Sequence, residues 1–356
     1  MAHDVLVLGA TVAGLTVARR LAHRGFDVLV LDPNGEGESA AIGHGVAAVG
    51  HASTIANMAH AYGLEAAREH VRRNLAGIEE IREISPAHDE VTLRDLSLPG
   101  GDETESRRIV ELYREAGHGA DLRVSPDGVA IHTAAFAVDP TAYAHALRAA
   151  AVAAGAHVVQ GVTVVRLTRR EGATRVHFRN NLAEVRDVGT VSGAAVVDTL
   201  GVSPWGRAAL VGPAQSVPVV RCVPSRPLRE VTLRAASTAW LMRPVGDRAL
   251  VLGQKTTPER VGDAAGELRR WCEERLGATD VELGRLAIDP SDHGRPVVGA
   301  SAIPGGYYAR GNGRGELMNG TASGWYLTEL MADGPGTTLP PISRLRAMMS
   351  RSISRA

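Results

Sequence analysis

A glycine-rich turn close to the amino terminus has the residues and the spacing that a dinucleotide site requires. Gly9-Ala-Thr-Val-Ala-Gly14 separates the apolar run Val5–Leu8 from a stretch of helical periodicity at Thr16–His23. Gly9 permits a tight turn, Gly14 lets helix and strand approach, and the N–H groups at the helix start face the pyrophosphate. Asp32 ends the next apolar run, where its carboxylate can accept hydrogen bonds from ribose hydroxyls.

One position departs from the usual glycine fingerprint, because Thr11 stands where a second glycine is typical. A side chain there obstructs the closest approach of backbone to phosphate, but a small hydroxyl can instead donate a hydrogen bond to it. The alternative is a Rossmann-like unit that packs a helix and binds nothing. The strand, turn, helix and strand in succession favour binding, with Gly9, Thr11, Ala13, Gly14 and Asp32 as the contacts.

The elements that would hold this turn are those of an α/β fold. Val5–Leu8 and Val28–Leu31 are predicted as buried strands on either side of a helix, which is a βαβ unit of a parallel sheet covered by helices. Leu64–Ile84 is strongly charged and is expected to form a surface helix, whereas Ser85–Asp127 has weak periodicity and is expected to enter a second lobe. Further helices are predicted at Ala52–Tyr62, Thr141–Ala154, Ala264–Leu276 and Thr321–Ala332, and further strands at His157–Val159, Val162–Leu167, Arg175–Phe178, Ala194–Thr199, Glu230–Leu233, Ala239–Met242, Ala249–Gly253, Pro296–Gly299 and Gly306–Ala309.

Length and composition exclude several classes of protein and partner. A chain of 356 residues suggests two lobes, and its formal net charge of zero gives no reason to expect a nucleic-acid or anionic-membrane partner. Cys222 and Cys272 are the only cysteines, so neither a disulfide framework nor a metal site is predicted. The sequence shows no signal peptide and no apolar run of the ~20 residues that span a bilayer, so a cytoplasmic location is expected.

Beyond the glycine turn, seven segments follow one another in an order typical of one flavoprotein family. They are Ser39–Ala48, Val138–Pro140, Gly161–Val164, Thr199–Trp205, Leu241–Gly253, Gly294–Gly299 and Gly311–Gly324. In this order they resemble the D-amino-acid oxidase superfamily of FAD-dependent oxidoreductases, a GR2-type flavoprotein family that includes glycine oxidase and sarcosine oxidase. The resemblance implies that the cofactor is FAD.

The resemblance also implies how the chain is divided. A Rossmann-like FAD-binding domain is expected to be interleaved with a strand-rich α+β substrate domain. The FAD-binding domain is expected to comprise residues 1–84, 137–214 and 292–335, and the substrate domain residues 85–136 and 215–291. Residues 336–356 are expected to form a tail.

In the family, the carboxy-terminal glycine segment lies beside the flavin ring, where backbone N–H groups favour the electron-rich reduced ring. Arg314 matches a position that is arginine in glycine oxidases, and a guanidinium there can hold a substrate carboxylate or stabilise the anionic flavin. An arginine paired on the surface is the alternative. The resemblance assigns further cofactor contacts to Val164, Gly201, Gly311, Gly313, Gly315, Glu316 and Leu317.

The substrate site departs from the family at Ile288. Glycine oxidases carry an arginine for the substrate carboxylate at this position, and a buried carboxylate without a partner costs several kcal/mol. We therefore expect poor activity on plain α-amino acids bound in the usual pose. Arg285 or Arg243 could take over this role from a neighbouring strand, whereas an aromatic content of 4% leaves few residues for an aromatic cage around an amine.

His44 and Lys255 are the other candidates near the flavin. Some relatives attach FAD covalently through a histidine near His44, but the local pattern here favours a neutral histidine in the pocket, with a titration range suited to proton handling. Packing alone is the alternative for His44. Lys255, the only lysine, matches a lysine that some relatives use in oxygen reduction, with ordinary surface exposure as the alternative.

These observations favour an FAD-dependent enzyme that oxidises a C–N bond of a small amine or amino-acid-like substrate. Hydride transfer to flavin N5 would be followed by reoxidation, with molecular oxygen as the expected acceptor. An aromatic-hydroxylase-type monooxygenase is the runner-up, because a small hydroxyl residue at the position of Thr11 is familiar in that group. A protein that kept the fold for a non-catalytic role is the third possibility.

Overall fold

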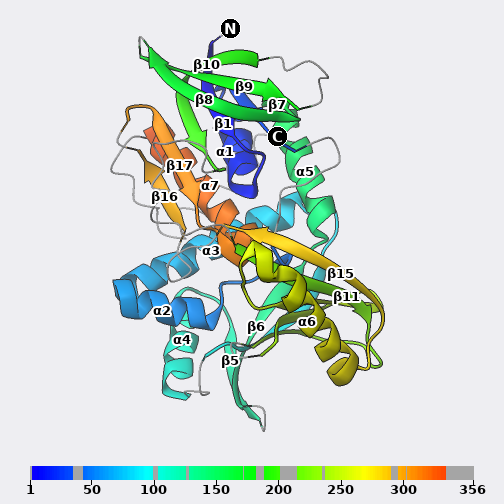
Figure 1. Cartoon of the computed structure of the whole chain (residues 1–356). Helices are drawn as coiled ribbons and strands as arrows, with labels where there is room; N and C mark the ends of the chain where they lie inside the picture. The colour runs from blue at the N-terminus through cyan, green and yellow to red at the C-terminus, as the bar shows by residue number, and fades with distance from the viewer. Residues whose placement is uncertain are drawn as a thin grey trace.

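The computed structural model describes residues 2–34, 43–98, 103–125, 128–170, 172–181, 188–200, 215–234, 237–289, 296–301 and 303–333. Two mixed sheets account for its strands. In Figure 1 they lie one above the other, with the carboxy-terminal helix α7 (Glu316–Asp333) near the middle of the molecule.

The first sheet places the glycine turn at the ends of three parallel strands. β1 (Ala2–Leu8) pairs in parallel with β2 (Val28–Leu31) and β10 (Val188–Asp198), so Leu8 lies opposite both Leu31 and Asp198. Because both faces of these strands are covered, the buried residues of β1 and β2 are all apolar. The remaining strands of this sheet are β7 (His157–Val159), β8 (Val162–Arg170), β9 (Ala173–Asn180), β16 (Val297–Ala300) and β17 (Gly306–Arg310).

Helix α1 (Val12–Ala22) packs against α5 (Pro140–Ala153) and α7. Glycines on α7 let the two helices come close, because a Cβ on Gly324 would lie 2.7 Å from the Ala13 carbonyl oxygen. Helix α7 was predicted to begin at Thr321, but it begins at Glu316. The glycines at 313, 315 and 320 weaken the helical pattern there, yet the helix is held by packing rather than by propensity.

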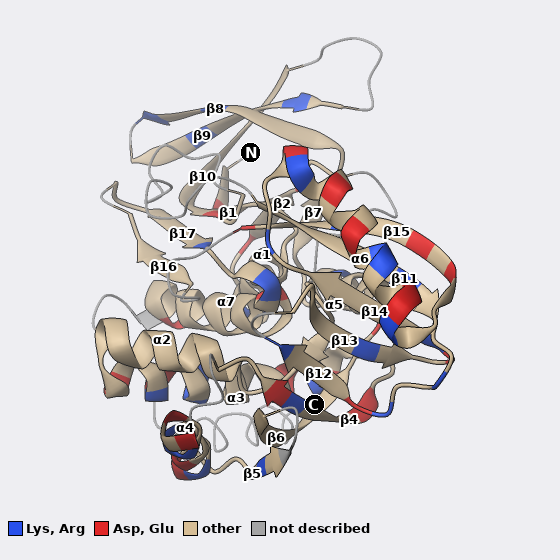
Figure 2. Cartoon of the chain, turned by 60° about the horizontal axis from the view of Figure 1, so that its bottom comes forward, with Lys and Arg blue, Asp and Glu red and all other residues tan. Residues whose placement is uncertain are grey.

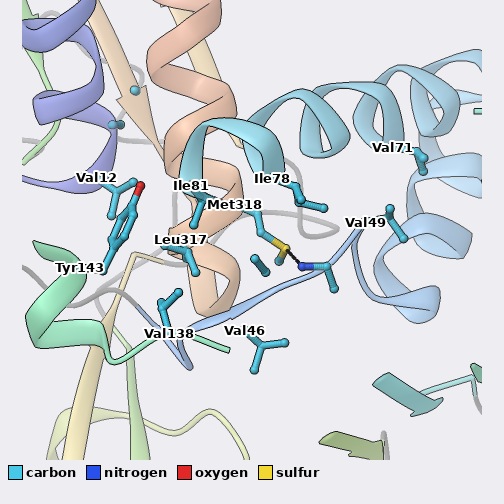
Figure 3. Packing of buried hydrophobic residues seen from close by; sticks show 14 of the residues in the cluster. Val12, Val46, Val49, Val71, Ile78, Ile81, Val138, Tyr143, Leu317 and Met318 are labelled. Atoms are coloured by element: carbon cyan, nitrogen blue, oxygen red, sulfur yellow. Dashed lines mark hydrogen bonds between the residues drawn. The ribbon is translucent and has the colours of Figure 1, made fainter. Parts of the chain in front are cut away.

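The main hydrophobic core surrounds the start of α7. Figure 3 shows Leu317 between Ile81 of α3 (Leu64–Ile84) and Val138, with the Met318 side chain below Ile78, and the backbone N–H of Ala48 donates to the Met318 sulfur at 2.8 Å. The expectation that α3 is a surface helix was right for one face only. Most of its charged residues lie on that face, whereas the opposite face, which packs beside α2 (Ala52–Tyr62) and includes Glu80, is buried.

The second sheet runs in the order β15-β11-β14-β13-β12-β4-β6-β3, and β5 pairs with β6. Helix α6 (Val261–Leu276) covers part of it over a small separate core that contains Cys222 and Cys272. Both signs of charge are distributed along α6 and α4 (Glu103–Glu115) in Figure 2. The strands are β3 (Val46–Ala47), β4 (Asp89–Leu96), β5 (Ala120–Ser125), β6 (Gly128–Ala137), β11 (Gln215–Val223), β12 (Val231–Arg234), β13 (Ala239–Val245), β14 (Arg248–Gly253) and β15 (Thr279–Ile288).

The region of weak periodicity, Ser85–Asp127, contains more structure than the sequence indicated. It forms β4, α4 and β5, and α4 buries Ile109, Val110, Leu112 and Tyr113 on one face. Only four of the thirteen residues of α4 are apolar, so this helix is strongly polar overall and is hard to distinguish from the mixed polarity around it. The proposed domain boundaries stay a prediction, although β3 joins the second sheet from within the segment assigned to the FAD-binding domain.

Within the described part of the chain, no helix combines the length and the apolar character needed to cross a membrane.

Candidate cofactor and substrate site

The glycine turn is built by close packing of backbone against backbone. Gly9 has a φ of +103°, which favours glycine, and the first turn of α1 follows directly after it. A Cβ on Gly14 would lie 2.2 Å from the Gly9 carbonyl oxygen. The hydroxyl of Thr199, at the end of β10, donates to the Leu8 carbonyl oxygen at 2.8 Å and so fixes the adjoining strand ends.

Thr11 caps helix α1. Its Oγ1 accepts a hydrogen bond from the Gly14 backbone N–H at 3.1 Å, and its backbone is extended, as is typical of an N-cap residue. The cap uses a lone pair of the hydroxyl and leaves its proton available. Donation of that proton to a phosphate stays a prediction, and the cap explains how a threonine is accommodated in place of glycine.

Asp32 is completely buried, and its carboxylate already has several protein donors. Oδ1 accepts from the Asn34 backbone and side chain at 3.3 and 3.1 Å, Oδ2 accepts from Arg148 at 3.1 Å, and the Ala10 backbone N–H also donates. Burial raises its pKa, and these donors oppose the rise. Because a carboxylate offers about four acceptor sites, a ribose hydroxyl would have to displace one of these donors. The ribose role of Asp32 stays a prediction. The sequence did not indicate the contact between Asp32 and Arg148 of α5.

A cavity of about 280 Å³ opens at the head of α1. It brings together Thr11 with residues from the far end of the chain, and Ile288 lies in its wall with 6% of its surface exposed. Ile288 is absent from the lining of the cavity around Arg314 described below. The cavity is lined by Thr11, Gly43, Thr199, Leu200, Ala287, Ile288, Asp289, Arg310, Asn312, Gly313 and Glu316.

Asp289, which the sequence did not single out, holds the carboxy-terminal glycine turn in place. Its carboxylate accepts two hydrogen bonds from the Arg310 guanidinium, at 2.7 and 2.8 Å, and one from the Gly311 N–H at 2.7 Å. Its carbonyl oxygen accepts from the Gly313 N–H at 2.9 Å. A carboxylate followed by a glycine-dense segment about twenty residues later is too general a pattern to have revealed this contact.

Removal of the Asp289 carboxylate should loosen this turn. We expect Asp289→Ala to destabilise the protein by about 2–3 kcal/mol, because it leaves the Arg310 guanidinium and the Gly311 N–H without their acceptor. Asp289→Asn keeps one acceptor oxygen and should lose about half as much. Urea unfolding followed by circular dichroism measures both, and an unchanged midpoint for Asp289→Ala would contradict this role.

The carboxy-terminal glycine turn, Gly311–Gly315, is enclosed by neighbouring backbone. Gly311 and Gly315 are buried, Gly313 is partly exposed, and Leu317 is buried in the main core. Gly43 packs directly on the turn, since a Cβ there would lie 2.2 Å from the Arg314 carbonyl oxygen. The residues expected beside a flavin are therefore gathered around one turn, and their contacts with the cofactor stay predictions.

Arg314 projects from this turn onto the second sheet. Its guanidinium carbon lies 3.3 Å from the centre of the Trp240 ring, and Trp240 in turn stacks on His51, with ring centres 5.1 Å apart. Burial lowers the pKa of Arg314 to about 9, which leaves it protonated at neutral pH. Trp240 and His51 were missed from the sequence, although Trp240 is one of only four tryptophans and directly precedes the segment Leu241–Gly253 that resembles the family.

A second cavity, of about 80 Å³, adjoins Arg314, Trp240 and His51. This is several times the ~10–15 Å³ that one water requires. Two polar atoms of residues that line it, Arg314 Nη1 and Asn74 Oδ1, are buried without a hydrogen-bond partner among the described residues. Lys255 lines the rim of the same cavity, and partial burial followed by the charge of Arg314 lowers its pKa.

His44 is buried beside this group, but it does not titrate where the sequence suggested. Its Nδ1 accepts from the Val46 N–H at 3.1 Å, which places the proton of the neutral ring on Nε2, a buried atom without a partner. Burial, together with the nearby His51 and cationic groups, lowers its pKa well below the ordinary value. A lowered pKa does not favour proton handling near neutral pH, and the neutral ring that the sequence suggested would present Nε2 as a donor. The catalytic role of His44 stays a prediction.

Other predicted residues lie elsewhere. Val164 packs in a hydrophobic cluster with Leu6 and Leu29, and it is not among the residues that line the cavity at the head of α1. Arg285 is exposed, whereas Arg243 is buried, donates to the Val138 carbonyl oxygen at 3.1 Å and has its pKa lowered to about 10 by burial. Gly201, residues 39–42 of the Ser39–Ala48 segment and the tail fall outside the described residues.

The residues present fit a bound dinucleotide. Gly9 and Gly14 let strand and helix pack closely, so the start of α1 lies at the cavity that Thr11 lines, and a helix start attracts phosphate. Thr11, Gly313 and Asn312 would line the bound molecule. Groups of three or more His, Cys, Asp or Glu that could hold a metal ion are absent from the described residues.

Comparison with known proteins identifies the wider group. Residues 4–330 match a family model described as FAD dependent oxidoreductase. Glycine oxidase from Geobacillus kaustophilus is similar in structure, with a TM-score of 0.69 and 18% identity over 96% of this chain and 97% of that chain. Iminodiacetate oxidase from Chelativorans sp. BNC1 has a TM-score of 0.70 and 20% identity over 96% and 98%, and L-proline dehydrogenase from P. horikoshii has 0.71 and 14% over 96% and 96%. At these identities the likeness shows a shared fold. No curated protein matches the chain by sequence.

Proposed function

The chain belongs to the family of FAD-dependent oxidoreductases, and on this premise we propose that it oxidises the carbon–nitrogen bond of a small amine that carries an anionic group. The family and the cofactor expected from the order of the sequence segments are confirmed. The substrate and the electron acceptor are our proposals.

One observation carries the proposed substrate class. Arg314 Nη1 and Asn74 Oδ1 are both buried, both lack a partner among the described residues, and both belong to residues that line the 80 Å³ cavity. A buried donor or acceptor without a partner is costly, typically about 1–3 kcal/mol, so a ligand that satisfies both gains that energy on binding. A cationic donor and an amide acceptor match a carboxylate and an amine nitrogen within one small molecule.

The side chains have separate tasks in this scheme. FAD, when bound, supplies the redox chemistry by accepting a hydride equivalent at flavin N5. Arg314 would hold the anionic group, and Asn74 Oδ1 would accept a hydrogen bond from the amine and so orient the neighbouring C–H bond. Burial, and then Arg314, lower the pKa of His51 to about 3, so His51 and Trp240 form a neutral wall that excludes water.

Ile288 affects the expected affinity. Ile288 stands where glycine oxidases carry an arginine, and it lines the cavity at the head of α1 rather than the cavity around Arg314, so Arg314 would hold the carboxylate without a second arginine. We therefore expect weak binding of plain α-amino acids. Molecular oxygen is our proposed acceptor, and we propose that Lys255, an exposed residue that also lines this cavity, assists its reduction.

Anaerobic bleaching of the FAD-loaded protein tests this function. Matched pairs should be compared, such as glycine with methylamine and sarcosine with dimethylamine. We expect the carboxylated member of each pair to bleach the flavin at least about tenfold faster, because only it can pair with Arg314. Equal rates within each pair would contradict the anionic substrate, and reduction by NADPH but by no amine would contradict amine oxidation altogether.

A further inference from the structure

Glu316 places a carboxyl group in the wall of the cavity at the head of α1. A charged carboxylate there would repel the phosphate groups of a dinucleotide bound in that cavity. Glu316 is the first residue of α7 and lines the cavity at the head of α1 together with Thr11 and Thr199. A Cβ on Gly320 would lie 3.0 Å from Glu316 Oε1 and 2.9 Å from the Val12 Cβ, so the carboxyl occupies the space that this glycine leaves beside α1.

The groups around Glu316 do not provide a cation to pair with it. The other titratable residues that line the cavity are Asp289, which directly follows β15, and Arg310 of β17. The charge of Asp289 is close enough to act on Glu316, and Arg310 is bound through two hydrogen bonds to Asp289. Asn312 donates a hydrogen bond to the Glu316 carboxyl, and α1 contributes only Thr11 and Val12. Among the described residues, no ion pair involves Glu316.

We propose that Glu316 is a cofactor-binding residue that holds FAD as a neutral carboxylic acid, with its O–H donating a hydrogen bond to a phosphate oxygen at the head of α1. A protonated carboxyl is a donor as well as an acceptor, so it can contact a phosphate that would repel a carboxylate. This inference rests on the dependence of the family on FAD and on no particular substrate.

The surroundings of Glu316 favour the neutral form. Burial, and then the negative charge of Asp289, raise its pKa to about 8, against the smaller effect of the hydrogen bond from Asn312. A phosphate beside it adds a further negative charge and raises the pKa of the bound state again. FAD should therefore bind best below pH 8 and more weakly as the pH rises through that value.

Titration of the FAD-free protein with FAD, followed by quenching of flavin fluorescence, tests this at pH 6 to 9. Loss of one proton from a group with a pKa of about 8 should raise the wild-type Kd about tenfold between pH 7 and pH 9. Glu316→Gln, which is neutral and can donate through its amide, should change less than about twofold over the same range. Glu273→Gln, on the exposed surface of α6, is the matched control and should keep the wild-type profile.

Thermal melting of the FAD-free proteins provides a second readout that needs no cofactor. The folded pKa of Glu316 lies above its unfolded value, so its stabilising contribution is present at low pH and is lost as the pH rises through 8. Glu316→Gln should therefore melt with the wild type at pH 5 and above it at pH 9. The same pH dependence of Kd in wild type and Glu316→Gln, or wild-type protein that binds no FAD at any pH, would overturn the proposal. FAD binding with the expected profile but no bleaching by amines would overturn the proposed substrate alone.

Discussion

Gly14→Ala is expected to abolish FAD binding and to destabilise the protein by at least ~3 kcal/mol. The added Cβ would lie 2.2 Å from the Gly9 carbonyl oxygen. Neither atom can move aside by a side-chain rotation, because the backbone fixes the positions of both. The strand end and the helix would have to separate, and this would displace the head of α1 and the Thr11 cap with it. Urea unfolding measures the first effect and fluorescence titration with FAD the second.

Gly266→Ala is the matched control for this substitution. Gly266 also lies within a helix, α6, but a Cβ there meets nothing within 4 Å. Alanine has the higher helix propensity, so Gly266→Ala should stabilise the protein by about 0.5–1 kcal/mol. Opposite signs for the two variants would show that the contact with Gly9, rather than the loss of a glycine, is responsible. A Gly14→Ala protein with wild-type stability would contradict the close approach.

Arg314→Ala is expected to lower kcat/KM for the best carboxylated amine by roughly 30- to 1,000-fold, about 2–4 kcal/mol. The variant removes the guanidinium that stacks on Trp240 and whose Nη1 is buried without a partner among the described residues. Because the loss concerns one anionic group, the preference for glycine over methylamine should disappear along with the rate. Steady-state kinetics on each matched pair measures the ratio.

Arg314→Lys separates charge from shape. A lysine keeps the positive charge but not the planar donor set, so it should retain part of the preference within each substrate pair and lose part of the rate. Trp240→Phe keeps an aromatic face under the arginine and should change the ratio least. If Arg314→Ala slowed both members of each pair equally, Arg314 would act on the turn or the flavin and not on the substrate carboxylate.

Local sequence patterns predicted the parts of the fold whose signal is contained in one segment. The β1–α1–β2 unit was predictable because glycine spacing, strand length and helical periodicity agree within the first thirty-odd residues. Helix α4 was missed because it is strongly polar overall, and α3 was placed on the surface because its charges hid a continuous buried face. Whether such a face is buried depends on the partner helix, here α7, which lies far along the chain.

The candidate site was predictable only in outline. Gly311–Gly315 and Arg314 could be selected because a dense run of glycines before a helix is rare and resembles a known family segment. Trp240, His51 and Asn74 come from β13, the segment before α2, and α3, and their meeting is a result of the tertiary fold. The low pKa of His44 also depends on burial and neighbouring charges, which no local pattern shows.

The packing of α7 against α1 determines when, during synthesis of the chain, the cofactor site can form. Arg24, just beyond α1, donates to Glu329 of α7, 305 positions further along the chain, and the cavity at the head of α1 takes Glu316 and Asn312 as part of its wall. A ribosome that has released the first forty residues has made the whole glycine turn but none of that wall. Contacts between such distant segments close late in folding. FAD can therefore be captured only after nearly all of the described chain has been made, and until then the turn is a binding motif without a binding site.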